Sequence, residues 1–290
     1  MKARIWGCRG SVASPGPDTV RYGGNTSCVE VRAADGTAIV LDAGTGMRAL
    51  GVQLEAEGVR EVHVLLSHLH LDHLQGLGFF KPLFDPDVHV HIWGPASPVH
   101  GLAERIALYL SPPLFPVRLS EIPSTVTFHD APEEPIQIGS LTVQAAAVTH
   151  QGPTVGYRLT EDGRSLCYLP DHEPSLGVRL QELEPEWISG YALAEGVDVL
   201  IHDAQYGDGE YPDHIGWGHS CIEHVVEFAR KAEVANLVLF HHDPYHDDAH
   251  LDALRTTAAE LLAQGDDAVT MAWEGMELDL TTATPAPVAP

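Results

Sequence analysis

The chain has 290 residues and is strongly acidic, with 41 Asp and Glu residues against 16 Lys and Arg and a formal net charge of −25. This charge excludes non-specific binding to nucleic acid or to anionic membranes, because both need basic patches on the protein. Hydrophobic residues make up 44% of the chain, which indicates a globular protein with a substantial core.

The expected location is the cytoplasm. No apolar run approaches the roughly 18 residues of a membrane span, and the first residues lack the pattern of a signal peptide. The four cysteines lie far apart and form no C-x-x-C motif, so we expect reduced thiols and no disulfide framework. Histidine is the unusual count, at 18 residues.

Short β-rich runs and amphipathic stretches alternate along the chain, and several strands meet through short turns. In chain order we expect strands at 5–8, 27–32 and 38–41, a helix at 47–57, strands at 62–67 and 88–93, a helix at 98–110, strands at 141–148, 155–159, 166–169 and 197–202, a helix at 220–232, a strand at 237–240 and a helix at 248–263. This order predicts an α/β protein with mixed sheets and outer helical layers.

One expected strand, 62–67, is almost continuously apolar, which predicts burial on both faces. The Pro-rich residues 111–116 are expected to form a surface loop. No shift in composition marks a second domain, so we expect one domain over 1–280. The residues 281–290 are rich in Thr, Pro and Ala and are expected to be a disordered tail.

An H-x-H-x-D-H array follows this apolar strand and contains His68, His70, Asp72 and His73. Residues two apart in an extended loop face the same way, so His68 and His70 can hold one metal ion. Asp72 and His73, at the turn into a helix, can face a second ion. Four metal-competent side chains within six residues strongly indicate a metal site, against the alternative of a solvated His-rich loop.

Further candidate ligands stand at the ends of later expected strands: His150, Asp171 and either His241 or His242. Each alone would be ambiguous, but a metal centre draws its ligands from several strand ends. Together with the array they supply five His and two Asp, which fits two divalent ions that share one carboxylate. Ligation by nitrogen and oxygen without thiolate favours Zn(II), with Mn(II) or Fe(II) as alternatives.

The order and spacing of these motifs resemble the metallo-β-lactamase superfamily over residues 5 to about 280. The resemblance implies an αββα four-layer sandwich, with Asp42 supporting the metal loop. It assigns one metal to His68, His70 and His150, the other to Asp72, His73 and His241, and the bridging role to Asp171. The resemblance favours His241 over His242. The stretch Leu239-Phe240-His241-His242-Asp243 resembles the strand followed by His-x-Ser of the phosphodiesterase branch, in which the first His is the ligand. Direct ligation is not expected from His63, His89, His91, His100, His214 or His246.

A second resemblance concerns catalysis. Ribonuclease Z and its phosphodiesterase relatives have an acidic residue that orients a His, and Asp203 and His219 stand in similar stretches. By this resemblance His219 would protonate the leaving oxygen, and the catalytic residues would be Asp72, Asp203 and His219. The alternative is that Asp203 and His219 are capping or surface residues.

The substrate is expected to be small. In ribonuclease Z a basic arm that holds tRNA follows the bridging Asp, whereas the segment 172–202 here is acidic, with no Lys and only Arg179. A cyclic nucleotide, a short oligonucleotide or a similar small phosphodiester is therefore favoured over tRNA, cleaved by attack of a metal-activated hydroxide. Trp217, Tyr206 and Tyr245 could stack on a base, or could be ordinary core or rim aromatics.

Two other functions stay open. A thioesterase or lactamase-type hydrolase of the same fold would not depend on His219, because a thiolate leaves without a proton donor. A non-catalytic metal-binding regulator is a third hypothesis, although degenerate members would be expected to lose ligands. No large nucleic acid and no membrane are expected as partners, and a homodimer is possible.

Overall fold

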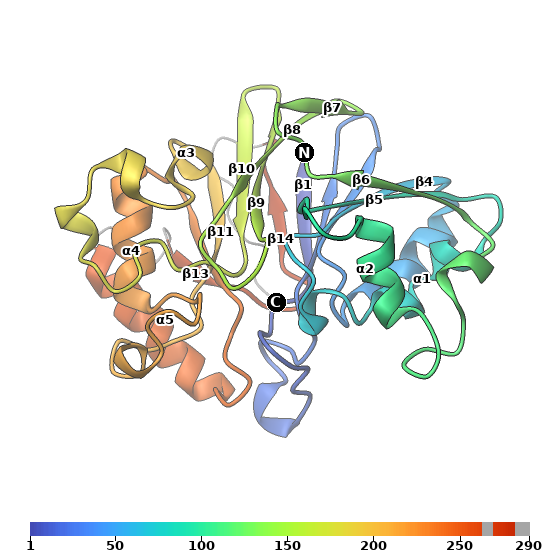
Figure 1. Ribbon diagram of the computed structural model, residues 1–290. Coiled ribbons are helices and arrows are strands. Elements are labelled where there is room, and N and C mark those ends of the chain that lie inside the picture. The colour runs from blue at the N-terminus through green and yellow to red at the C-terminus, as the bar shows by residue number, and fades with distance from the viewer. Residues whose placement is uncertain (263–268, 282–290) are drawn as a thin grey trace.

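Two seven-stranded sheets face each other at the centre of the molecule, and helices cover the outer face of each (Figure 1). The computed structural model describes residues 1–262 and 269–281. The layers follow the order helix, sheet, sheet, helix, so the predicted α/β class and αββα sandwich are confirmed.

The first sheet combines antiparallel and parallel pairing. Its antiparallel part joins β14, β1, β2 and β3, and the pairs from β3 to β6 are parallel. Its strands, in sheet order, are β14 (Glu277–Asp279), β1 (Lys2–Gly7), β2 (Cys28–Arg32), β3 (Ala38–Leu41), β4 (Glu61–Leu65), β5 (His89–Gly94) and β6 (Thr125–Asp130).

The second sheet has the same design. Its strands β7 to β10 pair antiparallel, and the pairs from β10 to β13 are parallel. In sheet order they are β13 (Val269–Met271), β12 (Leu237–Phe240), β11 (Val199–Asp203), β10 (Arg164–Leu169), β9 (Val155–Glu161), β8 (Leu141–Ala147) and β7 (Ile136–Ile138). The strands β8, β10, β11 and β12 therefore all end at one edge of this sheet.

The helices divide between the two outer faces (Figure 1). The first sheet packs against α1 (Met47–Glu57) and α2 (Leu102–Tyr109), and the second against α3 (Tyr191–Ala194), α4 (Ile222–Lys231) and α5 (Asp248–Leu262). Short 3₁₀ helices are η1 (Pro17–Thr19), η2 (Leu71–His73), η3 (Leu77–Phe79), η4 (Lys81–Phe84), η5 (Leu119–Glu121), η6 (Leu180–Glu182), η7 (Pro185–Trp187) and η8 (Tyr211–Asp213).

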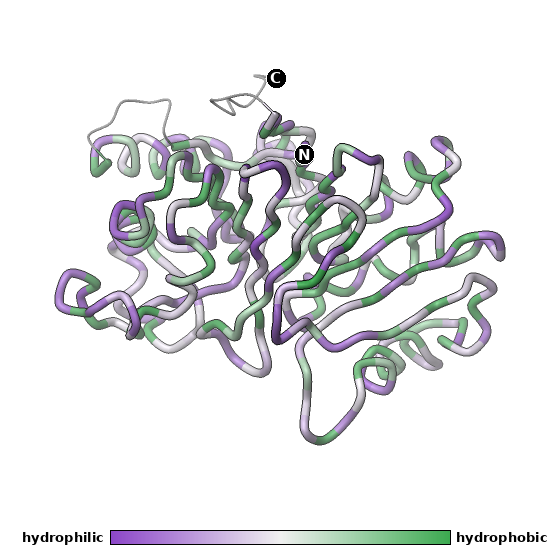
Figure 2. Tube along the Cα trace, turned by 90° about the horizontal axis from the view of Figure 1, so that it is seen from above, coloured by the Kyte–Doolittle hydropathy of each residue, from purple (hydrophilic) through white to green (hydrophobic). Residues whose placement is uncertain are grey.

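Three apolar clusters hold these layers together. One lies between the sheets, and the other two lie between each sheet and its helices. Hydrophobic and hydrophilic residues alternate along the trace when the molecule is seen from above (Figure 2). After its exposed first residue, β4 is buried throughout, as its apolar sequence predicted, because it has an apolar cluster on each side.

The helix expected at 47–57 is confirmed, and Gly58 ends it in a left-handed conformation with φ of +71°. The helix expected from residue 98 was wrong at its start: Gly101 is extended, and α2 begins at Leu102. The strands β6, β7, β13 and β14 were not predicted, because three of them have only three residues and β6 carries a polar face.

The Pro-rich residues 111–116 form turns and bends, as expected. Of the tail predicted to be disordered, 281–290, only residue 281 lies within the described residues. Residue 263, the last residue of the helix predicted at 248–263, also lies outside them. Within the described ranges, no helix combines the length and apolarity that crossing a membrane requires.

Candidate metal centre

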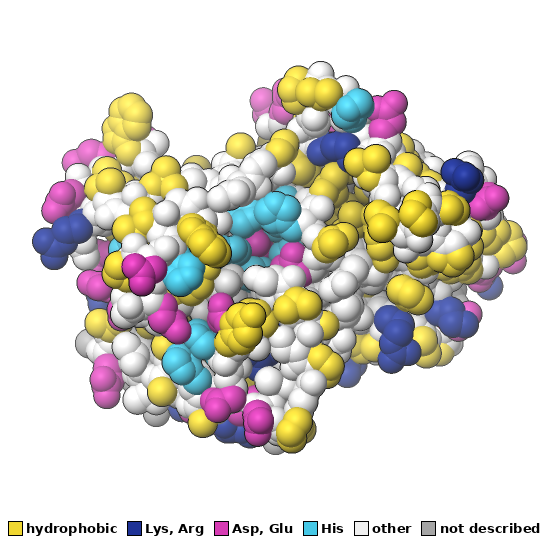
Figure 3. All heavy atoms as spheres, turned by 60° about the horizontal axis from the view of Figure 1, so that its bottom comes forward, with side chains coloured by type: hydrophobic (Ala, Val, Ile, Leu, Met, Phe, Trp, Pro, Cys, Tyr) yellow, Lys and Arg dark blue, Asp and Glu magenta, His cyan; other side chains and the backbone are white. Residues whose placement is uncertain are grey.

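Four strand ends bring the predicted ligands together at one edge of the sandwich. β4 leads into the loop with His68 and His70, and η2 follows with Asp72 and His73. His150 follows β8, Asp171 follows β10 and His241 follows β12. Figure 3 shows histidine and acidic side chains gathered in a depression on this face. A cavity of about 360 Å³ opens here, lined by Ser11, His70, Leu71, Asp72, Asp171, His219 and His241.

One group of four contains His68, His70, His150 and Asp171, with one ligand atom from each within 4.8 Å of the others. Asp171 Oδ2 lies 3.7 Å from His68 Nε2 and 3.6 Å from His150 Nε2. His70 Nδ1 lies 3.2 Å from His150 Nε2. These nitrogens surround one oxygen of the Asp171 carboxylate.

A second group of four contains Asp72, His73, Asp171 and His241, and all four residues are buried. Here the other carboxylate oxygen, Asp171 Oδ1, lies 2.9 Å from His73 Nε2 and 3.2 Å from His241 Nε2. Asp72 Oδ2 lies 3.2 Å from both of these nitrogens. Asp171 therefore faces each group with a different oxygen, as a bridging carboxylate would.

The hydrogen bonds of the imidazole rings set their tautomers. His73 Nδ1 donates to Asp42 Oδ2 at 2.8 Å, and His150 Nδ1 donates to the Gly218 carbonyl at 2.8 Å. His241 Nδ1 donates to Gln205 Oε1 at 3.0 Å. Because each Nδ1 carries the proton, each Nε2 directs a lone pair into the cluster.

His68 follows the same rule. Ser67 Oγ donates its own proton to Asp42 Oδ2 at 2.9 Å, so it accepts from His68 Nδ1 at 3.0 Å. Among the residues that the structure describes, His68 Nε2 and Asp171 Oδ1 are buried without a hydrogen-bond partner. Imidazole lone pairs and carboxylate oxygens that converge in a buried site repel one another unless cations lie between them. The donor set thus fits two divalent cations, and its nitrogen and oxygen atoms suit zinc.

The pKa values report the local potential. Burial alone would lower the pKa of His73, but Asp171, Asp72 and Asp42 raise it well above its ordinary value. Burial, and next the neighbouring His73, lowers the pKa of His68 well below the ordinary value. The three carboxylates around His73 therefore create a negative potential that divalent cations would neutralise. His68 is neutral, as a metal ligand must be.

Asp42 holds the metal loop from below, as the resemblance implied. Its fully buried carboxylate accepts from Ser67 N at 2.7 Å, from Tyr168 Oη at 2.9 Å and from His73 Nδ1. Its φ is +60°, in the left-handed region that a non-glycine residue rarely adopts. Such strain persists only where surrounding contacts fix the residue. Ser67 and Tyr168 carry no motif in the sequence, and their roles become visible only through these contacts.

His241, rather than its neighbour, faces the cluster. His242 points away and its Nε2 donates to the Ala272 carbonyl at 2.8 Å. His241 has a left-handed φ of +59°, and Gly10 packs directly on its ring, since a Cβ at Gly10 would lie 2.4 Å from His241 Nδ1. This close approach explains why residue 10 must be a glycine.

Asp203 and His219 form a buried pair beside the cluster. Asp203 Oδ2 accepts from His219 Nδ1 at 2.6 Å, and His219 Nδ1 lies 3.9 Å from Asp171 Oδ2. Burial lowers the pKa of His219, but Asp203 raises it to about 9 overall. Asp203 also accepts from the backbone N–H groups of Gln205 and Ser220. Asp203 and His219 therefore lie beside the candidate ligands. This geometry favours a role in the site over the alternative that they are capping or surface residues.

The loop that carries His219 is anchored by Glu173, which sequence analysis missed. This fully buried carboxylate accepts from Gly218 N at 2.8 Å, Gly216 N at 3.0 Å and Tyr211 Oη at 2.7 Å. Gly218 has φ of +90°, and a Cβ there would lie 2.3 Å from His150 Nδ1. In the sequence, Glu173 is one of several acidic residues in the segment 172–202, and nothing there indicates that it is buried.

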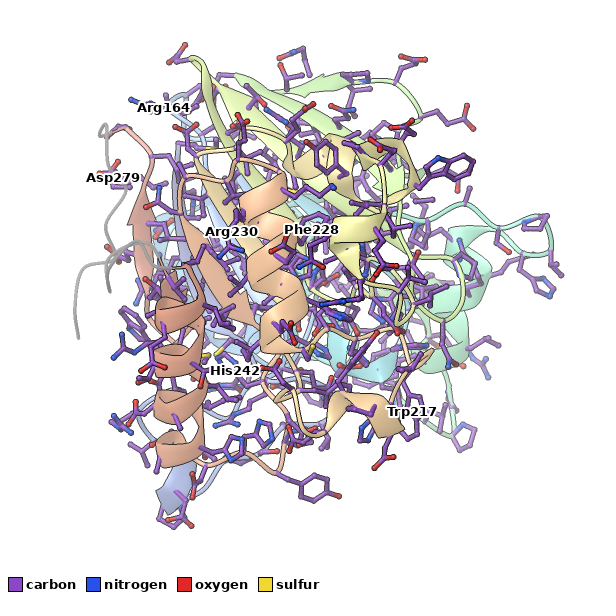
Figure 4. All side chains as sticks on the ribbon, turned by 90° about the vertical axis from the view of Figure 1, so that its left-hand side faces the viewer. Arg164, Trp217, Phe228, Arg230, His242 and Asp279 are labelled. Carbon is purple, nitrogen blue, oxygen red and sulfur yellow. The ribbon has the colours of Figure 1, made fainter. Side chains whose placement is uncertain are left out.

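The three aromatic residues considered for base stacking differ in exposure. Trp217 is 56% exposed and Tyr245 is 94% exposed, so both are open to solvent. Figure 4 shows Trp217 on the segment after η8, at the lower end of the molecule. Tyr206 is only 4% exposed and stacks on His214 with ring centroids 4.3 Å apart. The idea that Tyr206 could stack on a base was therefore wrong.

Comparisons with known proteins agree with this geometry. The family model described as β-lactamase superfamily domain matches residues 37–242. An uncharacterised protein of Mycobacterium tuberculosis is 29% identical over 252 residues, which cover 84% of this chain and 82% of that protein. Ribonuclease Z of Myxococcus xanthus is 26% identical over 262 residues, which cover 75% of this chain and 80% of that protein.

A solved structure supports the fold. The metallo-β-lactamase fold protein YhfI from Bacillus subtilis aligns with a TM-score of 0.69 and 19% sequence identity. The alignment covers 96% of this chain and 99% of that one.

Proposed function

The chain belongs to the metallo-β-lactamase superfamily of hydrolases, and we propose that it is a dinuclear-metal phosphodiesterase. The resemblance to ribonuclease Z is confirmed by the relative from Myxococcus xanthus. The observation that carries the proposal is the buried Asp203–His219 pair beside the two ligand groups.

Seven side chains would hold the two ions. One group would use His68, His70 and His150, the other Asp72, His73 and His241, with Asp171 shared between them. Two divalent ions in such a site supply Lewis acidity toward a phosphoryl oxygen and lower the pKa of a coordinated water. The chain itself fixes the Nε2 lone pairs through Asp42, Gln205, Ser67 and the Gly218 carbonyl.

His219 would supply the proton for the leaving group. Its Nδ1 is bound to Asp203, so Nε2 is the atom free to donate. When the P–O bond to the leaving group breaks, an alkoxide departs, and the Nε2 proton of the imidazolium passes to that oxygen. Asp203 keeps the ring oriented and stabilises its charged form. A thiolate needs no such donor, so this pair favours a phosphodiester over a thioester.

The surroundings favour a small diester. None of the residues lining the cavity is Lys or Arg, and the segment 172–202 has no Lys. A long polyanion would therefore meet an acidic surface, whereas one phosphodiester group would meet four positive charges from the two ions. A cyclic nucleotide or a short oligonucleotide fits this balance.

The test is a comparison of substrates with the His219→Ala variant. Turnover of a cyclic nucleotide by the zinc-loaded protein should fall while the zinc content stays unchanged. If the parent protein cleaves a thioester or a β-lactam well and the variant cleaves it equally well, the same fold would instead perform that chemistry. If zinc binds but no substrate is cleaved, the chain would be a metal-binding regulator.

A further inference from the structure

A second group of histidines lies away from the candidate metal centre, on the first sheet. His63 is on β4, His89 and His91 are on β5, and His129 is on β6. Along β5, Val90 and Ile92 belong to the apolar cluster beneath α1 and α2. Since successive side chains alternate between faces, the histidines lie on the opposite face of the sheet. We call this group, together with Glu61, the histidine face.

Three members of the histidine face converge. His63 and His91 are directly paired across β4 and β5, and their rings stack with centroids 4.5 Å apart. Glu61 Oε1 lies 3.2 Å from His63 Nε2 and 3.7 Å from His91 Nε2. Two atoms bound at about 2.0–2.1 Å to a tetrahedral zinc ion lie roughly 3.3 Å apart. Glu61 Oε1 thus lies at nearly the spacing of a metal ligand from both nitrogens, and all three ligand atoms lie within 4.8 Å of one another. The two rings are only 9° from parallel, so they must tilt before both Nε2 lone pairs can point at one ion.

The ring of His91 is also held from behind. His91 Nδ1 lies 3.1 Å from His129 Nε2, and the His129 ring stacks on Trp93 with centroids 3.9 Å apart. When His91 Nδ1 donates to His129, the lone pair of His91 Nε2 faces Glu61. A histidine fixed through its second nitrogen in this way is typical of metal ligands.

His63, His91 and His129 have lowered pKa values and are neutral, as ligands must be. Burial lowers the pKa of His63 and of His129. Burial and the adjacent His63 lower the pKa of His91 to about 4. At neutral pH each of these imidazoles therefore carries one ring proton, and a metal ion need not displace a second one.

The group is open to solvent. Glu61 is exposed, and with His63 it lines a cavity of about 350 Å³ together with Gly36, Thr37, Val59, Arg60 and Gly139. His63 precedes His68 by five residues, so their Cα atoms are separated by at most roughly 17 Å of extended chain. An ion can therefore reach the histidine face without passing through the other centre.

We propose that Glu61, His63 and His91 bind one divalent transition-metal ion of the zinc class, at a site separate from the dinuclear centre. Binding at His63 Nε2 requires the ring proton on Nδ1, where Trp93 Nε1 now donates at 3.4 Å. The indole must therefore move when the ion binds, and its fluorescence must change.

The test measures zinc per chain by elemental analysis after equilibrium dialysis of the full chain, with zinc alone as the probe. The His63→Ala/His91→Ala double variant should hold one zinc fewer than the parent, and Glu61→Gln should bind that ion at least roughly 10-fold more weakly. The matched control is His100→Ala, since His100 also lies beside a glutamate, Glu104, but on the surface. This control should keep the parent's zinc content.

Trp93 provides a second readout. Titration with Co(II) should quench part of the tryptophan emission of the parent, and the double variant should lose that part. The test measures the difference in zinc content between parent and double variant, so its result does not depend on how many ions the dinuclear centre binds. Phosphodiester turnover should be the same in parent and double variant. Equal zinc content in parent, double variant and Glu61→Gln, each with an unchanged melting curve, would overturn the proposal.

Discussion

Replacing His219 with alanine tests the proposed leaving-group acid. The imidazole is 9% exposed and lines the cavity next to Asp171, so its removal leaves space that water fills. Water is a far weaker acid than an imidazolium paired with Asp203 at 2.6 Å. General acid catalysis contributes roughly 100- to 10,000-fold, so we expect kcat on a cyclic nucleotide to fall at least about 100-fold. That loss corresponds to about 2.7 kcal/mol of barrier.

The assay compares two leaving groups. A cyclic nucleotide expels an alkoxide that needs a proton, whereas bis(p-nitrophenyl) phosphate expels a stable phenolate that needs it much less. The loss should therefore be larger for the cyclic nucleotide, while elemental analysis shows unchanged metal content. His214→Ala is the matched control for kcat, because His214 lies on the same loop, belongs to neither ligand group, and packs on Tyr206 and Trp217. Equal turnover by parent and His219→Ala on both substrates would refute the assignment of the acid.

Three further predictions follow from single contacts. Asp171→Ala should lose metal and activity together, as measured by elemental analysis and diester turnover, because both ligand groups share this carboxylate. Trp217→Ala should raise KM roughly 5- to 150-fold for a nucleotide diester but not for a non-aromatic diester, since base stacking contributes about 1–3 kcal/mol. Asp198→Asn should lower the free energy of unfolding at pH 7 by about 1–2 kcal/mol, measured by urea titration, because Asp198 accepts from Arg164 at 2.7 Å.

The Asp198 effect should depend on pH. Burial raises the pKa of Asp198, but Arg164 and the backbone N–H of Ser165 lower it overall. The difference between parent and variant should therefore be fully present above the unfolded pKa of about 3.9 and disappear as the pH falls through the lower folded value. Arg164 lies at the opposite end of the molecule from Trp217 (Figure 4), so turnover should not change.

Each of these predictions has a contradicting result. Full metal occupancy in Asp171→Ala would remove that residue from the site. An equal rise in KM on both diesters would show that Trp217 acts through the loop rather than by stacking. A pH-independent difference for Asp198→Asn would mean that its charge makes no net contribution.

The sequence was most informative where function leaves a local pattern. The array from His68 to His73 is visible because its members are adjacent, and the apolar run before it identified β4. Asp171 and His241 could be proposed because each follows a recognisable strand, but only the fold shows that they meet.

The sequence was least informative where function depends on contacts between distant segments. Glu173 looks like part of a solvated acidic segment, and only its hydrogen bonds to Gly216 and Gly218 identify it as a buried anchor. Tyr206 could be a base-stacking, core or rim aromatic by its sequence, and only the fold shows that it is buried. His63 and His91 are likewise not expected to be ligands from the sequence, where they are far apart, and they meet only through the pairing of β4 with β5.

The most direct test of the central claim is a turnover screen of the zinc-loaded protein over cyclic nucleotides, dinucleotides, lipid diesters, thioesters and a β-lactam. The proposed function predicts that a small phosphodiester is hydrolysed fastest, that a chelator abolishes this activity and that zinc restores it. Faster cleavage of a thioester or the β-lactam, or diester hydrolysis that survives complete removal of metal, would contradict it.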